Sequence, residues 1–481
     1  MNKRPNILFI NTDQHAWDAI SAYGNPYLRT PNIDELHRNG TSFHRSFCTD
    51  PVCAAARSSW ATGLYTSETG VPFNGGYLHP EIPDLGQLLN AGGYKAFHCG
   101  KWHVPGRNVR ESFRTLYYGQ QDIGAGGAAY YDSASTHAVA DFLTNYDSDE
   151  PFYLQIGFVD PHDVCEYLHN HEEKHIPNPL EQGIVSEDDL PPLPENFDYD
   201  ERETVLHRVC RRVDDALIHA AILKGIRDWD EFHWRYLRWN YYRFIEKVDA
   251  EIGRVLALLR ETSRHHNTLI IFSADHGEAC GSHQMFQKFT LYEESVRVPF
   301  IVACLGEEIP VEKDRFNETH FVSGVDLFPT VCDYAGIDVP EEVQGLSIRP
   351  LAEGRDAPWR DYAYIESNYW GRAIVTDQYK YVTEYKPTFN SNSGVEDFYP
   401  PGPDVEQLGL AQLFDRQNDP GEMENLVGNP TYNEVVKICK NKLFAQEARL
   451  HRQQIVHPSP RRVISNWGGR LRTYWQMEDS H

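Results

Sequence analysis

Asn6-Ile7-Leu8-Phe9-Ile10-Asn11-Thr12-Asp13-Gln14 is the stretch that decides the fold. The run from Ile7 to Ile10 is short and wholly apolar, which is typical of a strand buried on both faces of a parallel sheet. Polar residues follow at once and end in Asp13 and Gln14. The stretch predicts an α/β fold, with a large, mixed and mostly parallel sheet flanked by helices.

Other strand-like runs end in the same way. They span 95–98, 152–158 and 268–272, and the clusters that follow are Gly100-Lys101-Trp102-His103, Asp160-Pro161-His162-Asp163 and Ser273-Ala274-Asp275-His276-Gly277-Glu278. Open α/β sheets place their sites just beyond the carboxyl ends of their strands. We therefore expect these polar side chains to gather at one edge of the sheet. From Tyr241 to Leu259, apolar residues at three- and four-residue spacings predict a long amphipathic helix that packs on the core.

The character of the chain changes near Asp356. Short strand-like runs at 362–365, 372–376 and 379–383 are joined by tight turns, with a hairpin turn at 377–378. A loop is expected over 387–403, and a last strand and helix after it. The sequence thus predicts a larger α/β domain over 1–355 and a smaller α+β subdomain with an antiparallel sheet over 356–481. Basic and aromatic residues between Arg461 and Trp475 predict a tail that docks on its own surface or on a second subunit.

Composition excludes several classes of protein. The 481 residues carry a formal charge of −25, which argues against nucleic acid as a partner because phosphate binding needs a basic footprint. No apolar run approaches the ~20 residues that cross a bilayer, and the first one is too short for a signal peptide. We expect a cytoplasmic protein without a membrane anchor, or a periplasmic or secreted one if a signal was trimmed. An anionic substrate would need a local cationic cluster to offset the overall field.

The strongest chemical signal is Cys53-Ala54-Ala55-Ala56-Arg57, followed by Thr62-Gly63. Taken alone, it also fits a buried thiol beside an arginine. Together with the other clusters, in this order, it resembles the signature of the type I sulfatases of the alkaline phosphatase superfamily, and the resemblance spans almost the whole chain. It implies an alkaline phosphatase-like fold and the hydrolysis of a sulfate ester. It also implies that a maturation enzyme converts Cys53 to formylglycine, whose hydrate attacks sulfur.

The resemblance carries roles to individual residues. Those that match the ligands of one divalent cation are Asp13, Gln14, Cys53 as formylglycine, Asp275 and His276. Arg57 matches the arginine that steadies the formylglycine hydrate. The other matches to catalytic residues are Lys101, His103, His162 and Lys288, and Asn74 matches an asparagine that contacts the sulfate.

The hydrolysis of a sulfate ester requires residues of these types. In the transition state, charge spreads over the equatorial oxygens of the sulfate, and fixed cations and hydrogen-bond donors stabilise it. His162 or Lys288 is expected to protonate the departing alcohol. His103 is expected to take the proton whose loss releases sulfate and restores the aldehyde.

Gln14 and His276 depart from the commonest family pattern, in which Asp and Asn stand at these positions. Both variants resemble the branch that includes choline sulfatases and phosphonate monoester hydrolases. Calcium prefers oxygen ligands, whereas an imidazole also suits manganese. We expect Ca²⁺, with Mn²⁺ as the alternative.

No motif identifies the leaving group. Candidates for lining the substrate pocket are His79, Trp102, Arg107, Asp163 and Trp370. We expect a sulfated carbohydrate, either a small molecule or an oligosaccharide. The alternatives are an aryl or choline sulfate, a phosphonate monoester or phosphodiester substrate for the same nucleophile, and a non-catalytic binding protein that keeps the fold.

Overall fold

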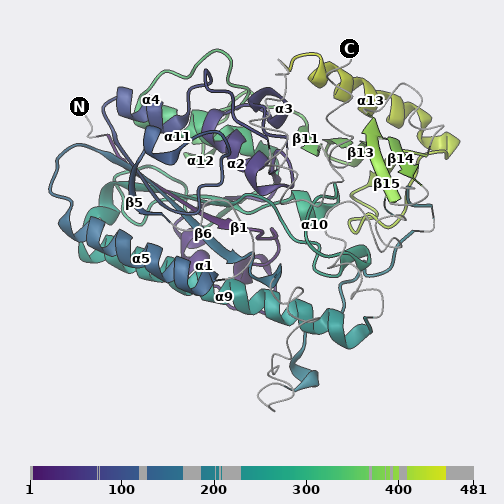
Figure 1. Ribbon diagram of the computed structural model, residues 1–481, viewed down its shortest axis with the longest axis horizontal. Coiled ribbons are helices and arrows are strands. Elements are labelled where there is room, and N and C mark those ends of the chain that lie inside the picture. The colour runs from purple at the N-terminus through teal and green to yellow at the C-terminus, as the bar shows by residue number, and fades with distance from the viewer. Residues whose placement is uncertain are drawn as a thin grey trace.

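The computed structural model describes residues 4–72, 74, 76–118, 127–165, 186–200, 202–204, 207, 229–367, 371–384, 386–390, 394–399 and 409–450. A mixed sheet lies at its centre, and a smaller antiparallel sheet lies toward the C-terminus (Figure 1). This confirms the predicted fold class. Among these residues, none of the helices combines the length and the apolar character that a bilayer crossing needs.

The central sheet has the strand order β5-β4-β6-β1-β7-β8-β2-β9. β1 lies in its interior and pairs in parallel with β6 and β7, whereas β8 runs antiparallel to both of its neighbours. The runs predicted as strands after β1 correspond to β4, β6 and β7. The bounds are β1 (Asn6–Asp13), β2 (Gly40–Phe43), β4 (Lys95–Gly100), β5 (Arg114–Tyr118), β6 (Phe152–Pro161), β7 (Thr268–Ala274), β8 (Phe300–Ala303) and β9 (Arg315–Asn317).

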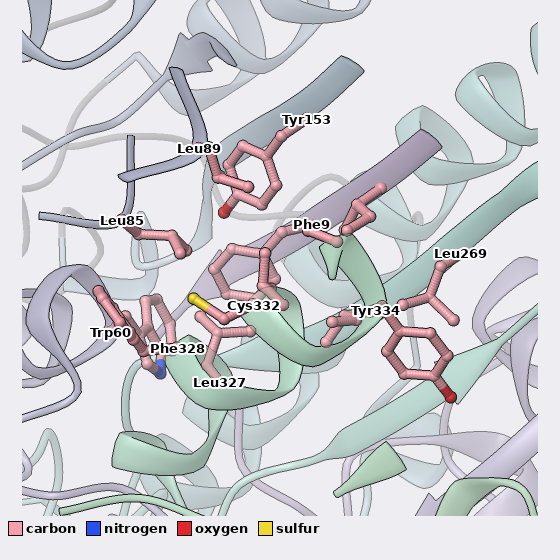
Figure 2. Close-up of a cluster of buried hydrophobic side chains, with 14 of the residues drawn as sticks. Phe9, Trp60, Leu85, Leu89, Tyr153, Leu269, Leu327, Phe328, Cys332 and Tyr334 are labelled. Carbon is pink, nitrogen blue, oxygen red and sulfur yellow. The ribbon is translucent and has the colours of Figure 1, made fainter. Parts of the chain in front are cut away.

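Helices cover both faces of the sheet. Successive residues of β1 point to opposite sides, and because all of them from Ile7 to Ile10 are apolar, each side needs a covering layer. Ile7 and Phe9 belong to a cluster that includes α2 (Cys53–Thr62), α4 (Leu85–Ala91), α11 (Leu327–Ala335) and α12 (Arg349–Ala352), and Figure 2 shows the part of it around Phe9. Leu8 and Ile10 belong to a second cluster with α1 (Pro31–Arg38), α5 (Ala128–Asn145) and α9 (Glu231–Glu261). Figure 1 shows α5 and α9 on the side of β1 and β6 opposite to α4 and α11. Strand β1 is therefore buried on both faces, as its composition predicts.

The C-terminal sheet is antiparallel, in the order β11-β12-β13-β16. Its strands are β11 (Ala363–Ser367), β12 (Gly371–Val375), β13 (Tyr379–Glu384) and β16 (Ala411–Asp415), and α13 (Asn433–Glu447) packs on it. The predicted strands, the hairpin turn at 377–378 and the last strand and helix are confirmed. The domain boundary at residue 355 stays a prediction, and the tail from residue 451, with its predicted docking, lies outside the described residues.

The loop predicted over 387–403 is wrong in its first part. Strands β14 (Lys386–Asn390) and β15 (Gly394–Tyr399) pair there as an antiparallel hairpin. Pro, Gly and Asn in this stretch indicated a loop, but it also contains Thr388, Phe389 and Val395, which favour strands. A two-stranded ribbon consists of edge strands, and edge strands tolerate Pro387.

Glu366 of β11 ties the C-terminal sheet to α3 (Thr66–Thr69), which follows α2 in the chain. Its carboxylate accepts hydrogen bonds from Thr66 Oγ1 at 2.6 Å, Ser67 N at 2.8 Å and Ser67 Oγ at 2.7 Å. Glu366→Gln replaces one acceptor oxygen with a donor, so a buried group loses its partner. We expect the free energy of unfolding at pH 7 to fall by about 1–3 kcal/mol, measured by chemical denaturation.

The pH dependence of stability gives a second readout of the same contact. Burial raises the pKa of Glu366, but Arg372 and the hydrogen bonds from Thr66 and Ser67 lower it more, and the net pKa lies below the ordinary value. The stabilisation is therefore present above the ordinary glutamate pKa and is lost as pH falls through the folded-state value. The exposed control Glu318→Gln should leave stability unchanged. Equal stability of Glu366→Gln and wild type from pH 3 to pH 7 would contradict this prediction.

Candidate active site

Strands β1 and β7 end side by side, and the residues that follow them begin the candidate site. The two strands pair in parallel up to residues 12 and 274, so Asp13 and Asp275 lie at the same level of the sheet. The Gln14 backbone has a left-handed φ of 66°, and its N–H donates to Asp275 Oδ1 at 3.0 Å. The predicted convergence at the carboxyl edge is confirmed for these strands.

The side chains of Asp13, Cys53, Asp275 and His276 form a buried cluster. Each offers one ligand atom, and these atoms lie within 4.8 Å of one another. His276 Nε2 lies 3.9 Å from Asp13 Oδ1 and 3.7 Å from Asp275 Oδ1, which is too long for hydrogen bonds and suits the ligands of one cation. His276 Nδ1 donates to the Gly277 carbonyl at 2.9 Å, so Nε2 is the ring nitrogen that faces the cluster.

Cys53 is the first residue of α2 and is buried. The N-terminus of a helix carries a partial positive charge that favours an anion. Asn74 lies beside this end, because its side-chain oxygen accepts from Ala54 N at 3.2 Å.

Arg57, one helical turn after Cys53, binds both carboxylates of the cluster. It donates Nη2 to Asp13 Oδ2 at 3.0 Å and Nε to Asp275 Oδ2 at 2.8 Å. The Oδ1 atoms of the two aspartates are the atoms that lie near His276 Nε2. Arg57 therefore fixes the two carboxylates with one oxygen of each left for the cluster.

Two buried lysines complete a local cationic cluster. Lys101 Nζ lies 2.7 Å from Asp13 Oδ2. Lys288 Nζ donates to Gln14 Oε1 at 2.9 Å and to Cys53 Sγ at 3.0 Å. Together with Arg57, these groups provide the local positive charge that a protein of net charge −25 needs in order to bind an anion.

His103 and His162 both interact with the thiol of Cys53. Burial lowers the pKa of His103. Burial and Lys288 lower the pKa of His162 to about 4, and its Nε2 lies 3.8 Å from Asp13 Oδ1. Both imidazoles are therefore neutral at neutral pH in this state of the site.

The site favours a negative charge at residue 53. Burial and Asp13 raise the pKa of the Cys53 thiol, but Lys288, His276 and Lys101 lower it more, and the net pKa lies well below its usual value. Burial and Asp13 raise the pKa of Asp275 to about 6 even though Arg57 opposes the shift. The carboxylates of Asp13 and Asp275 repel each other, and a cation bound between them would remove this repulsion.

Some residues of the site were missed or misread from sequence. Tyr241 of α9 was expected only to pack in the core, but its hydroxyl also donates to the Gln14 carbonyl at 2.8 Å and accepts from Ala16 N at 2.8 Å. The spacing of apolar residues in this helix predicts packing on the core but does not predict a hydrogen bond to Gln14. Glu278 could have been found from sequence, since it stands in the polar cluster after β7. Its Oε2 accepts from Gln14 Nε2 at 2.5 Å.

The pocket residues Trp102 and Arg107 were predicted wrongly. Trp102 is buried against His98 and Phe113, and Arg107 Nη1 donates to Asp84 Oδ2 at 2.6 Å. Both residues belong to the core because an apolar ring and a paired guanidinium are stable there. The side chain of Asp163 accepts from Ala128 N at 2.8 Å, at the start of α5. Trp370 lies outside the described residues, and a role for His79 stays a prediction.

Comparison with known proteins identifies the family of this chain. The family described as Sulfatase matches residues 5–337, and the family described as N-sulphoglucosamine sulphohydrolase, C-terminal, matches residues 281–401. A Delta 4,5-hexuronate-2-O-sulfatase of Bacteroides thetaiotaomicron is 27% identical, over 90% of this chain and 87% of the relative.

Solved structures share the fold. A 2-O GAG sulfatase has a TM-score of 0.75 at 24% identity, over 95% of this chain and 96% of the other. The phosphonate monoester hydrolase of Agrobacterium radiobacter has a TM-score of 0.70 at 22% identity, over 93% and 96%. The fold is that of sulfatases and phosphonate hydrolases of known structure. The chain belongs to the sulfatase family, and it is a sulfuric ester hydrolase.

Proposed function

We propose that this sulfatase hydrolyses the sulfate ester of a carbohydrate, with formylglycine at position 53 and one divalent cation. The observation that carries the proposal is the cluster of Asp13, Cys53, Asp275 and His276, whose ligand atoms lie within 4.8 Å of one another. Lys288 Nζ, at 3.0 Å from Cys53 Sγ, supports the binding of an anionic sulfate beside residue 53. The thiol sulfur stands in here for the oxygen atoms of the matured residue.

The donor set fits a divalent cation. Asp13 and Asp275 each offer one oxygen, and His276 offers Nε2. The side-chain oxygen of Gln14, which accepts from Lys288 Nζ at 2.9 Å, is the further oxygen that we propose as a ligand. Oxygen donors favour Ca²⁺, and the imidazole keeps Mn²⁺ as the alternative. A bound cation would supply Lewis acidity that lowers the pKa of a hydroxyl of the matured residue.

The remaining residues act on charge and protons. Lys101 and Lys288 would neutralise the sulfate oxygens, and the N-terminus of α2 would add a partial positive charge. Lys288, which stays charged, would give a proton to the leaving alcohol, and His162 would do so only where the bound substrate restores its protonated form. His103 would take the proton whose loss releases sulfate. Arg57 would hold both aspartates in place through the cycle.

The proposed carbohydrate substrate is supported by what relatives act on. The Delta 4,5-hexuronate-2-O-sulfatase and the 2-O GAG sulfatase are both named for sulfated sugars. The alternative is a phosphonate monoester, because the phosphonate hydrolase shares the fold. The sulfatase family match over residues 5–337 favours sulfate.

Mass spectrometry and paired substrates test the proposal. When the full chain is produced together with a formylglycine-generating enzyme, the tryptic peptide 46–57 should lose roughly 18 Da at Cys53. Cys48 lies in the same peptide and serves as an internal control that stays unmodified. A panel of sulfated saccharides should be hydrolysed faster than an aryl phosphonate. An unmodified Cys53 in active enzyme, or faster phosphonate turnover, would contradict the proposal.

A further inference from the structure

The carboxamide of Gln14 lies between a hydrogen-bond donor, Lys288, and a hydrogen-bond acceptor, Glu278. Its Oε1 accepts from Lys288 Nζ at 2.9 Å, on the side of Cys53. Its Nε2 donates to Glu278 Oε2 at 2.5 Å and to Cys165 Sγ at 3.5 Å. An ammonium group only donates hydrogen bonds and a carboxylate only accepts them. The two neighbours therefore select the same one of the two orientations of the amide.

The orientation matters because Gln14 stands where an aspartate would present an oxygen from either end. A carboxamide presents an oxygen in one orientation and an NH₂ group in the other, and an NH₂ group does not bind a cation. We propose that Glu278 is a positioning residue that fixes the Gln14 carboxamide with its oxygen toward the cation. This inference rests on the metal site of the proposed function.

Glu278 is itself held in place. It is buried, with 2% of its surface exposed, and its Oε1 accepts from Cys280 N at 3.0 Å and from Gln287 N at 2.6 Å. These backbone donors need an oxygen, so the carboxylate has one oxygen engaged and the other directed to Gln14. The contact between Glu278 and Gln14 joins the loops that follow β7 and β1.

The backbone of Gln14 is fixed independently of Glu278. Its carbonyl accepts from the Tyr241 hydroxyl at 2.8 Å, and its N–H donates to Asp275 Oδ1 at 3.0 Å. These contacts support the left-handed φ of 66°. Loss of the Glu278 carboxylate is therefore expected to release the orientation of the amide without moving the loop.

Glu278→Gln tests this with almost no change of shape. The oxygen of the new carboxamide would serve the backbone N–H groups of Cys280 and Gln287, so its NH₂ group would face Gln14. The Gln14 oxygen would then have a donor on each side, the new NH₂ group and Lys288 Nζ, so the amide would no longer be fixed with its oxygen toward the cation. We expect the Kd for Mn²⁺ and Ca²⁺, measured by isothermal titration of the purified full chain, to rise about 10–100-fold.

The swapped pair Gln14→Glu with Glu278→Gln separates positioning from a structural role. A carboxylate at position 14 has no wrong orientation, and it accepts from the NH₂ group at position 278. The double variant should recover the wild-type Kd, whereas Glu278→Gln alone binds more weakly, and this rescue is the signature of a direct contact. Glu294→Gln is the matched control, since Glu294 is a neighbouring half-buried glutamate that accepts from Asn196 at 2.6 Å. It should bind both cations as wild type does.

The outcomes differ in what they overturn. Glu278→Gln with a wild-type Kd, or a double variant as weak as Glu278→Gln, would overturn the inference and leave the metal site standing. Wild-type protein without heat of binding or a shift of Tm on addition of MnCl₂ or CaCl₂ would overturn the metal site, and the inference with it. The unfolding of each metal-free variant is monitored by circular dichroism. A stability equal to that of wild type shows that a changed Kd reflects the folded site.

Discussion

Cys53→Ala is expected to lower kcat for the sulfate ester at least about 10³-fold, to the background rate, because it removes the group that becomes the nucleophile. The side chain lies at the start of α2 and interacts with Lys288 at 3.0 Å and with His276 at 3.1 Å. Its replacement by a methyl group leaves the helix intact, since alanine is the best helix former. Initial rates on a sulfated saccharide, with Tm measured on the same samples, check this.

Cys48 provides a matched control for Cys53. It is also buried, and it lies in an apolar cluster with Phe47 and Val298. Burial and Asp50 raise the pKa of its thiol well above the usual value, opposite to the shift at Cys53. Cys48→Ala is expected to keep wild-type kcat with some loss of stability. Wild-type rates in Cys53→Ala, or equal losses in both variants, would remove residue 53 from the mechanism.

The frame of the site could be predicted from sequence because it depends on local patterns. An apolar run followed by Asp13 and Gln14, and another followed by Asp275 and His276, indicate parallel strands that end at one edge of a sheet. The register of β1 and β7 then brings the four residues together. The spacing of Cys53 and Arg57, one helical turn apart on α2, determines that both reach this edge.

The contacts that orient the ligands could not be predicted in this way. Tyr241 reaches the Gln14 carbonyl from a position 227 residues away in the chain, and its spacing is that of any helix packing on a sheet. Trp102 stands between Lys101 and His103 but turns into the core, because a loop is not bound to place neighbouring side chains on one side. Such contacts depend on how separate elements pack, and periodicity contains no information about that.

Lys288 gives the second large effect that we expect. Its ammonium group lies 3.0 Å from Cys53 Sγ and 2.9 Å from Gln14 Oε1. Cys53 and Asp13 raise its pKa even though burial opposes this, so the side chain stays charged. Lys288→Met keeps the length and removes the charge, and Lys288→Ala removes both. Loss of one fixed charge on the sulfate should lower kcat about 10²–10³-fold, and loss of a proton donor would lower it further. Steady-state kinetics that resolve kcat from KM measure the effect.

Lys380 is the control for a buried lysine without a role in catalysis. It lies in the C-terminal sheet, where its Nζ is 3.2 Å from Glu293 Oε1 and 2.8 Å from Glu422 Oε1. Lys380→Met leaves buried carboxylates unpaired and should lower the free energy of unfolding by about 3–5 kcal/mol, with an unchanged kcat per folded molecule. Lys288→Met should differ in that kcat per folded molecule itself falls, whatever stability the buried charge contributes. An unchanged kcat per folded molecule would mean that Lys288 supports the fold and that another group neutralises the sulfate.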